Sequence, residues 1–256
     1  DAFIMLAKTG DALSCFLVPR ILEDGTLNGL RFQRLKDKLG NRSNASSEVE
    51  FSDTFGFLLG EEGHGIRTIL DMVTLTRLDC ALSSAGMMRA SLSEAVHHCR
   101  YRSVFGNELI DQPLMTRVLA DLSLDVARAH ADPAEAAYAR LMTPVVKYWV
   151  CKIAPSVIYE AMESLGGNGY IEERALARHY REAPVNAIWE GSGNVMALDV
   201  LRVLARGPDL FDAVVSDLVK DLGAAGTRTA DVLKACMAVC RTDEAGGRML
   251  TEQLAL

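Results

Sequence analysis

The spacing of apolar residues divides the chain into two parts with different secondary structure. Up to about residue 60, short apolar runs alternate with turn signals, and Thr9-Gly10-Asp11 separates the first two runs. The pattern predicts strands at 2–7, 13–18, 30–35 and 48–51. Because short turns join most of these strands, we expect a mostly antiparallel sheet.

The apolar spacing becomes helical beyond Gly63-His64-Gly65. From Ile66 to Phe105 the pattern predicts one helix of roughly 40 residues, well above the globular mean and typical of a helical bundle. Further helices are predicted after Pro113, from about Pro133 to Leu165, around 172–179, from Asn194 to Gly207, and as two or three shorter helices in 209–256. Strands followed by helices predict an α+β chain with a boundary near residue 62.

The start of the sequence suggests that a part of the protein precedes it. The chain opens at Asp1, without an initiator Met, and enters an apolar, strand-like stretch at once. Terminal residues are usually loosely held and seldom begin inside a strand. We therefore expect an upstream part to be missing.

Composition and charge narrow the function classes. The 256 residues are 49% hydrophobic and 24% charged, which is ordinary for a globular protein and excludes intrinsic disorder. A net charge of −7, from 27 Lys and Arg against 34 Asp and Glu, disfavours a general nucleic-acid binder.

The cysteines and the hydropathy indicate the compartment. The six cysteines form no CxxC pair and most lie in apolar helical company, as thiols do in a reducing cytosol, so no metal site is predicted. No apolar run reaches the roughly 18 residues of a membrane span, and no signal peptide opens the sequence. These features predict a cytoplasmic protein without a membrane partner.

Two neighbouring stretches carry the candidate chemistry. Glycine is dense in Gly166-Gly167-Asn168-Gly169, which would let a backbone approach a ligand closely, although helix capping explains such a cluster equally well. Glu190 stands between Ile188-Trp189 and a Gly-Ser-Gly stretch. A carboxylate beside these apolar side chains would lose hydration and become a better base for a carbon acid. The alternative is a Glu in the first turn of a helix, favoured by the helix dipole.

These two stretches resemble the C-terminal signature of the flavin-dependent acyl-CoA dehydrogenases, and other motifs occur in the family's order. Leu59-Gly60-Glu61-Glu62-Gly63-His64-Gly65 looks like the loop into the long helix, and Arg102-Ser103-Val104-Phe105-Gly106, followed by Gln112, looks like the family's Arg-x-x-Phe-Gly segment. The stretches 36–46 and 182–196 look most like the alkylation-response branch, whose flavoproteins serve the bacterial adaptive response and are associated with DNA.

The resemblance implies roles for individual residues. Glu190 matches the base that removes the α-proton of an acyl-CoA while the β-hydrogen leaves as hydride to the N5 atom of FAD. Some relatives place this base just before the conserved Arg of the long helix, but Thr76 stands there before Arg77, so Glu190 has no rival. The implied FAD-binding residues are Arg102, Phe105, Gln112, Gly166, Gly167, Ser192 and Asn194, and the implied substrate-binding residues are Arg77 and Gly191.

The resemblance also implies the domain organisation. Residues 1–62 would be part of a middle β domain, 63–208 a long-helix bundle with the flavin and catalytic motifs, and 209–256 a C-terminal helical extension. The family's N-terminal helical domain and the first half of its β domain are absent, so we expect an incomplete acyl pocket. The family spacing leaves open whether residues are also absent near 128–132. Because Arg102 matches a residue that pairs with the flavin of a neighbouring subunit, we expect a homo-oligomer, a dimer of dimers.

Two functions remain open at this point. The first is an FAD-dependent acyl-CoA dehydrogenase, an oxidoreductase that forms a 2,3-enoyl thioester. The alternative is an alkylation-stress-response flavoprotein that binds or protects DNA, with weak or vestigial dehydrogenase activity. Charge does not support DNA binding, because acidic residues outnumber basic ones from Asp209 onward. The sequence does not give the acyl chain length or the electron acceptor.

Overall fold

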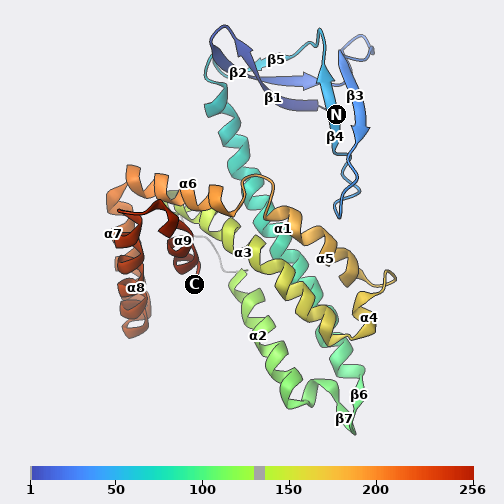
Figure 1. The fold of residues 1–256 in the computed structure, drawn as a ribbon, viewed down its shortest axis with the longest axis vertical. Coiled ribbons are helices and arrows are strands. Elements are labelled where there is room, and N and C mark those ends of the chain that lie inside the picture. The colour runs from blue at the N-terminus through green and yellow to red at the C-terminus, as the bar shows by residue number, and fades with distance from the viewer. Residues whose placement is uncertain (1, 130–135) are drawn as a thin grey trace. The chain divides into compact units, whose positions relative to one another are not determined.

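The computed structural model describes residues 2–129 and 136–256, which form two compact units that span 1–76 and 77–256. Figure 1 shows strands in the first unit and a bundle of helices in the second. This architecture confirms the predicted fold class, an antiparallel β part followed by an α-helical bundle. The sequence leaves open whether residues are absent near 128–132, and most of this stretch lies in 130–135, outside the described residues.

The first unit is built from antiparallel strands, as predicted. Strands β1 (Ala2–Thr9), β2 (Ala12–Pro19) and β5 (Phe57–Leu59) form a sheet in the order β1-β2-β5, and β3 (Leu30–Leu35) pairs with β4 (Ser47–Phe51). The ladder between β1 and β2 runs from the pair Ala2 and Pro19 to the pair Thr9 and Ala12. Strand β5 was not predicted, because three residues between Gly56 and Gly60 are too short to show a period.

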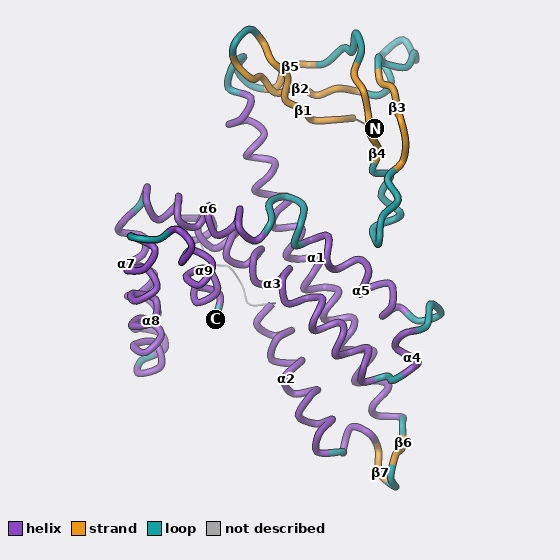
Figure 2. Tube along the Cα trace, in the orientation of Figure 1, coloured by secondary structure: helices purple, strands orange, loops and turns teal. Residues whose placement is uncertain are grey.

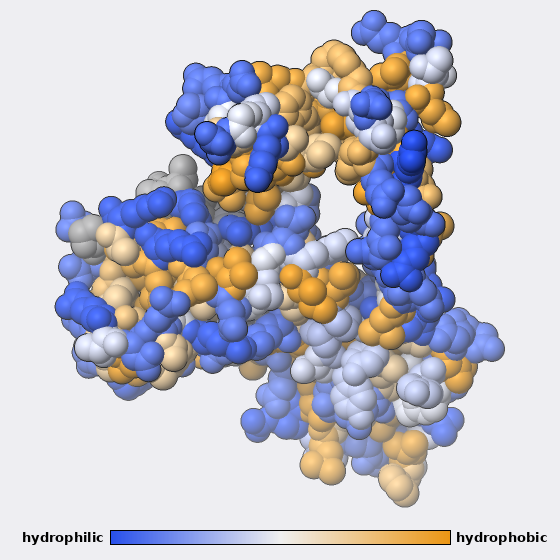
Figure 3. Space-filling model, turned by 45° about the horizontal axis from the view of Figure 1, so that its top comes forward, coloured by the Kyte–Doolittle hydropathy of each residue, from blue (hydrophilic) through white to orange (hydrophobic). Residues whose placement is uncertain are grey.

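The strand unit buries little and leaves apolar surface exposed. Cys15 and Val18 of β2 are buried, whereas Phe32, Phe55 and Phe57 are nearly half exposed. Figure 3 shows such apolar side chains at the molecular surface. A hollow of about 600 Å³ in this unit is lined by Pro19, Ile21, Leu22, Glu23, Asp24, Phe55 and Phe57. Apolar surface of this kind marks places where proteins meet other molecules.

The long helix α1 (Gly65–Tyr101) ends before the predicted Phe105. Strands β6 (Ser103–Val104) and β7 (Asn107–Glu108) follow it as a two-stranded hairpin. The hairpin turns at Phe105 and Gly106, whose φ angles are +50° and +85°, as a two-residue hairpin turn requires. The prediction was wrong here because Val104 and Phe105 continue the helical spacing of apolar residues into the hairpin.

The remaining helices build the second unit (Figure 2). They are α2 (Pro113–Ala129), α3 (Ala136–Ser164), α4 (Gly167–Tyr170), α5 (Ala175–Asn186), α6 (Gly193–Arg206), α7 (Pro208–Leu222), α8 (Ala224–Cys240) and α9 (Gly247–Ala255), with single 3₁₀ turns at Leu109–Asp111 and Glu244–Gly246. The helix expected around 172–179 instead starts at Ala175 and continues to Asn186. Among the described residues, no helix is long and apolar enough to cross a membrane.

Helix α3 contributes to two hydrophobic cores. Its N-terminal part, with Leu141 and Val145, packs with residues of α6–α9. Its later part, with Ile158 and Met162, packs with α1, α2 and α5. A helix that is buried on several faces along its length fixes the elements around it, so α3 is the natural support for a functional site in this unit.

Truncation of the core should show this dependence. We expect Ile158→Ala to lower the free energy of unfolding by about 2–5 kcal/mol, since Ile158 is fully buried and its loss leaves a cavity. Leu124→Ala on the exposed side of α2 is the matched control and should change it by about 0.5 kcal/mol. Urea denaturation measures both, and equal effects would contradict the placement of the core.

Candidate functional site

The predicted site residues fall into two groups near opposite ends of the helical unit (Figure 1). Arg77 lies in α1 and contacts the turn that contains Glu190. Arg102 follows the end of α1, about 37 Å away along the axis at 1.5 Å per residue. Gly191, Ser192 and Asn194 belong to the group at Glu190, and Phe105 and Gln112 belong to the group at Arg102. Gly166 and Gly167 follow α3, whose last residues share a core with the last turns of α1, so we assign them to the group at Arg102. The structure thus does not bring all of these residues together within one chain.

Glu190 lies in a tight turn between α5 and α6. Its φ angle is +56°, a left-handed conformation that a residue with a Cβ seldom adopts. Gly191 follows with a φ of +104°, and a Cβ there would lie 2.6 Å from Cε of Met196. The backbone around Glu190 is therefore held in an unfavourable conformation, and other contacts must maintain it.

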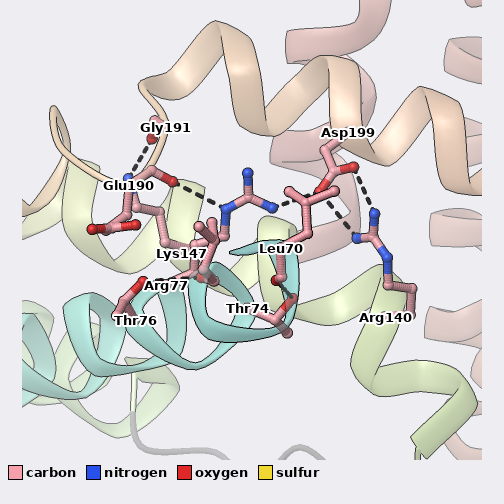
Figure 4. A network of polar contacts seen from close by, with 10 residues as sticks. Leu70, Thr74, Thr76, Arg77, Arg140, Lys147, Glu190, Gly191 and Asp199 are labelled. Atoms are coloured by element: carbon pink, nitrogen blue, oxygen red, sulfur yellow. Dashed lines mark hydrogen bonds and ion pairs between the residues drawn. The ribbon is translucent and has the colours of Figure 1, made fainter. Parts of the chain in front are cut away.

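Two cations, the buried Lys147 and the largely buried Arg77, hold the carbonyl groups of this turn (Figure 4). Lys147 of α3 donates from Nζ to the Trp189 carbonyl at 2.9 Å and to the Gly191 carbonyl at 2.5 Å. Arg77 donates from Nε to the Glu190 carbonyl at 3.0 Å. Three successive carbonyls thus accept hydrogen bonds from side chains of α1 and α3. We call residues 189–191 with these two cations the clamped turn.

Asp199 of α6 fixes one of the two cations. Its carboxylate accepts from Arg77 Nη1 at 2.8 Å and from both terminal nitrogens of Arg140, at 3.0 and 2.8 Å. Burial opposes the ionisation of Asp199, but the hydrogen bonds and charges of Arg140 and Arg77 outweigh it, so the pKa of this carboxyl is lowered. Asp199 therefore stays charged at neutral pH and orients Arg77 toward the turn.

The apolar neighbours of Glu190 do not enclose it within the described residues. Ile188 is 66% exposed and Trp189 is 37% exposed. The Trp189 indole donates to Asn186 Oδ1 at 3.1 Å, and Asn186 in turn donates to Ser84 Oγ at 3.0 Å. The dehydration that the sequence predicts for Glu190 would thus require a further surface against Ile188.

The group at Arg102 presents an unusual surface. Phe105 is 97% exposed, and its backbone is in a left-handed conformation. Arg102, three residues earlier, is exposed as well. Gln112 donates from Nε2 to the Val104 carbonyl at 3.1 Å and so supports the hairpin. An exposed aromatic ring on a strained, supported turn is typical of a surface that contacts another molecule.

The glycines after α3 also leave open surface. Gly166 has a φ of +58°, and a Cβ at Gly166 or Gly167 would meet nothing within 4 Å. The backbone here can therefore be approached closely. Gly169, in contrast, is packed against the Met162 carbonyl, at 2.2 Å from the place of a Cβ, and serves the fold.

Sequence reasoning missed Lys147 and Asp199. Lys147 is the single charge in the apolar stretch Pro144-Val145-Val146-Lys147-Tyr148-Trp149-Val150, and Asp199 interrupts the apolar face of α6. An isolated charge on an otherwise buried face is the signal that could have found them.

The ion pairs of Asp199 should carry much of the stability of the site. We expect Asp199→Asn to lower the free energy of unfolding by about 3 kcal/mol, because the change leaves Arg77 buried without its partner. Since the folded-state pKa of Asp199 is lowered, this contribution is present above the ordinary pKa of Asp and disappears as the pH falls through the folded-state value.

Asp121→Asn is the matched control for that experiment. Asp121 makes an exposed ion pair with Arg117 within α2, so its loss should change the stability by about 0.5 kcal/mol or less. Urea denaturation of both variants between pH 3 and 7 checks the expectation. A stability difference between Asp199→Asn and the original protein that does not shrink toward low pH would contradict it.

Comparison with known proteins identifies the family. Residues 63–205 match the family described as acyl-CoA dehydrogenase, C-terminal domain. The chain is 50% identical to AidB of Escherichia coli K12, an alignment that covers 100% of this chain and 50% of AidB. This likeness confirms the resemblance to the alkylation-response branch.

Solved structures agree with the fold. The apo form of Bd2924 covers 98% of this chain and 54% of its own, with a TM-score of 0.89 and 27% identity. ACDH-11 of Caenorhabditis elegans, in complex with C11-CoA, covers 95% of this chain and 47% of its own, with a TM-score of 0.81 and 29% identity. The chain spans about half the length of these relatives. Its helical unit and the motifs on it show that the chain belongs to the acyl-CoA dehydrogenase family.

Proposed function

We propose that this chain is the base-bearing part of an FAD-dependent acyl-CoA dehydrogenase, with Glu190 as the catalytic base. Glu190 takes the α-proton of the acyl thioester, the α C–H electron pair forms the new double bond, and the β-hydrogen leaves with its electron pair. Bound FAD would accept that hydride at N5. The enoyl thioester is the product.

The clamped turn is the observation that carries this proposal. The backbone of Glu190 is left-handed, and Lys147 and Arg77 hold the carbonyls around it, so the position from which the carboxylate projects is pre-organised. Figure 4 shows the Glu190 carboxylate on the side of the turn away from Asp199. The cations thus engage the backbone, while the carboxylate carries the chemistry. That ACDH-11 was solved with C11-CoA supports an acyl thioester as the substrate class.

The residues near Arg102 fit FAD. A guanidinium suits the two charges of a pyrophosphate, the exposed ring of Phe105 suits an aromatic surface, and the open backbone at Gly166 and Gly167 admits a closely bound group. Acyl-CoA dehydrogenases are generally FAD proteins. Near Glu190, Ser192 and Asn194 are both exposed, so their side chains are available to a ligand.

The separation of the two groups supports an oligomer. One FAD molecule does not span the length of α1 between Arg77 and Arg102, so one chain cannot supply both groups to one cofactor. Two copies in antiparallel arrangement can, with Glu190 of one copy and Arg102 of the other at the same FAD. We propose a homo-oligomer on this basis, and the dimer of dimers is the form that the family resemblance implies.

DNA protection stays a prediction that the structure does not favour over the enzymatic role. Acidic residues outnumber basic ones in α7–α9, as in the sequence. Arg77 and Arg140 are engaged with Asp199. A protein that binds the phosphate backbone of DNA would present its cations on one face.

Replacing the base tests the proposal. We expect Glu190→Gln to slow the reduction of bound FAD by butyryl-CoA about 10²–10⁴-fold, because the amide cannot accept the α-proton. Stopped-flow absorbance of the FAD-loaded protein measures the rate. Glu182→Gln in α5 is the control and should leave it unchanged. If the original protein and Glu190→Gln bleach the flavin equally fast, Glu190 is not the base.

A second substitution tests the contribution of the other end of α1. We expect Arg102→Met to weaken FAD binding about 10–100-fold, since it removes charge-assisted hydrogen bonds to the pyrophosphate. Fluorescence titration with FAD measures the affinity, and Arg100→Met, also exposed and two residues earlier, should leave it unchanged. A monodisperse monomer that binds FAD tightly would contradict the shared site.

A further inference from the structure

Lys147 is buried to a degree that lysine seldom reaches. Its side chain is 1% exposed, and it is among the largest fully buried side chains of the described residues. Burial lowers the pKa of its ammonium group, since removal of a cation from water is unfavourable. A methionine of similar length would fill the same space without this penalty, so the needs of the fold alone do not explain a lysine here.

The groups that face Lys147 do not compensate its charge by an ion pair. Arg77 and Cys80 approach it from α1, Cys151 from its own helix, and Glu190 from the turn. Burial raises the pKa of both thiols, that of Cys151 to about 11, so they are neutral at pH 7. Within 2–129 and 136–256, no carboxylate lies within ion-pair distance of the ammonium group.

The two hydrogen-bond acceptors of Lys147 lie on either side of one residue. They are the carbonyls of Trp189 and Gly191, and the residue between them is Glu190. A charged donor that holds the 189–190 and 191–192 peptide groups restrains the dihedral angles between them, which are φ and ψ of Glu190 and φ and ψ of Gly191. Arg77, from α1, donates to the Glu190 carbonyl, but it also donates to Asp199. Both hydrogen bonds of Lys147, in contrast, go to carbonyls of the turn.

We propose that Lys147 is a positioning residue for Glu190: its ammonium group spans the carbonyls of Trp189 and Gly191 and keeps the Glu190 backbone in the left-handed conformation that presents the carboxylate. This inference rests on the proposed role of Glu190 as the base. It assigns no contact with substrate or FAD to Lys147. Its function is to hold the base in place at the expense of stability.

The test compares Lys147→Met with Lys152→Met in the same helix. Lys152 is exposed and lies about one and a half turns further along α3, so it controls for the loss of a lysine. Two readouts are needed. Hydrogen exchange follows the amides of Ala187, Ile188 and Trp189, which bond to carbonyls of Pro184 and Val185. Stopped-flow measurement gives the limiting rate of FAD reduction by butyryl-CoA and, separately, the concentration at half-maximal rate.

We expect the exchange of these amides to be at least about tenfold faster in Lys147→Met, because two charge-assisted hydrogen bonds are lost. The limiting rate should fall about 10–100-fold at an unchanged half-saturating concentration. The melting temperature should stay the same or rise, as the buried charge is gone. Lys147→Gln, which retains a neutral donor, should lie between the two. Lys152→Met should match the original protein in every readout.

Two results would overturn the proposal. One is unchanged exchange at 187–189 in a folded Lys147→Met variant. The other is unfolding of both Lys147→Met and Lys147→Gln with faster exchange throughout α3 and α6, because Lys147 would then serve the fold and not the turn. The exchange readout needs no catalysis. If exchange is faster in Lys147→Met while neither butyryl-CoA nor a longer acyl-CoA reduces the flavin of the original protein, the positioning role is supported and the proposed function is contradicted.

Discussion

The carbonyl groups of residues 189–191 depend on two buried cations, and the arrangement of the candidate active site follows from this interaction. A left-handed backbone at Glu190 is unfavourable by itself, by about 1–2 kcal/mol for a residue with a Cβ. Lys147 and Arg77 offset that strain through charged hydrogen bonds. Asp199 and Arg140 keep Arg77 in place, and the two cores along α3 keep Lys147 in place. Helices α1, α3 and α6 thus converge on one turn.

Stability and function are in opposition at this turn. A buried ammonium group, a left-handed glutamate and two half-exposed apolar side chains, Ile188 and Trp189, each make the fold less stable than an apolar, regular alternative would. Their presence together at one turn agrees with the proposed role of Glu190 as a positioned base. The hairpin at Phe105, a strained and exposed turn at the other end of α1, has the same character.

Local patterns in the sequence predicted most of the elements, but they could not predict the clamp. The antiparallel strands and the long helix followed from the apolar period, and the proposal of Glu190 came from a motif and the family resemblance. The predicted end of the long helix was wrong, because Val104 and Phe105 continue the helical spacing of apolar residues although the backbone turns back at Gly106. The hydrogen bonds of the clamped turn join residues 42 to 113 positions apart, and no local pattern encodes such pairs. Lys147 and Asp199 were visible only as isolated charges in apolar helices.

A crystal structure of the FAD-loaded protein with a bound, non-reacting acyl thioester would test the account most directly. We expect the Glu190 carboxylate to lie at contact distance from the α-carbon, Lys147 still to donate to the carbonyls of Trp189 and Gly191, and Arg102 at the same FAD to come from another copy of the chain. A Glu190 side chain turned away from the α-carbon, or a Lys147 released from both carbonyls, would contradict it.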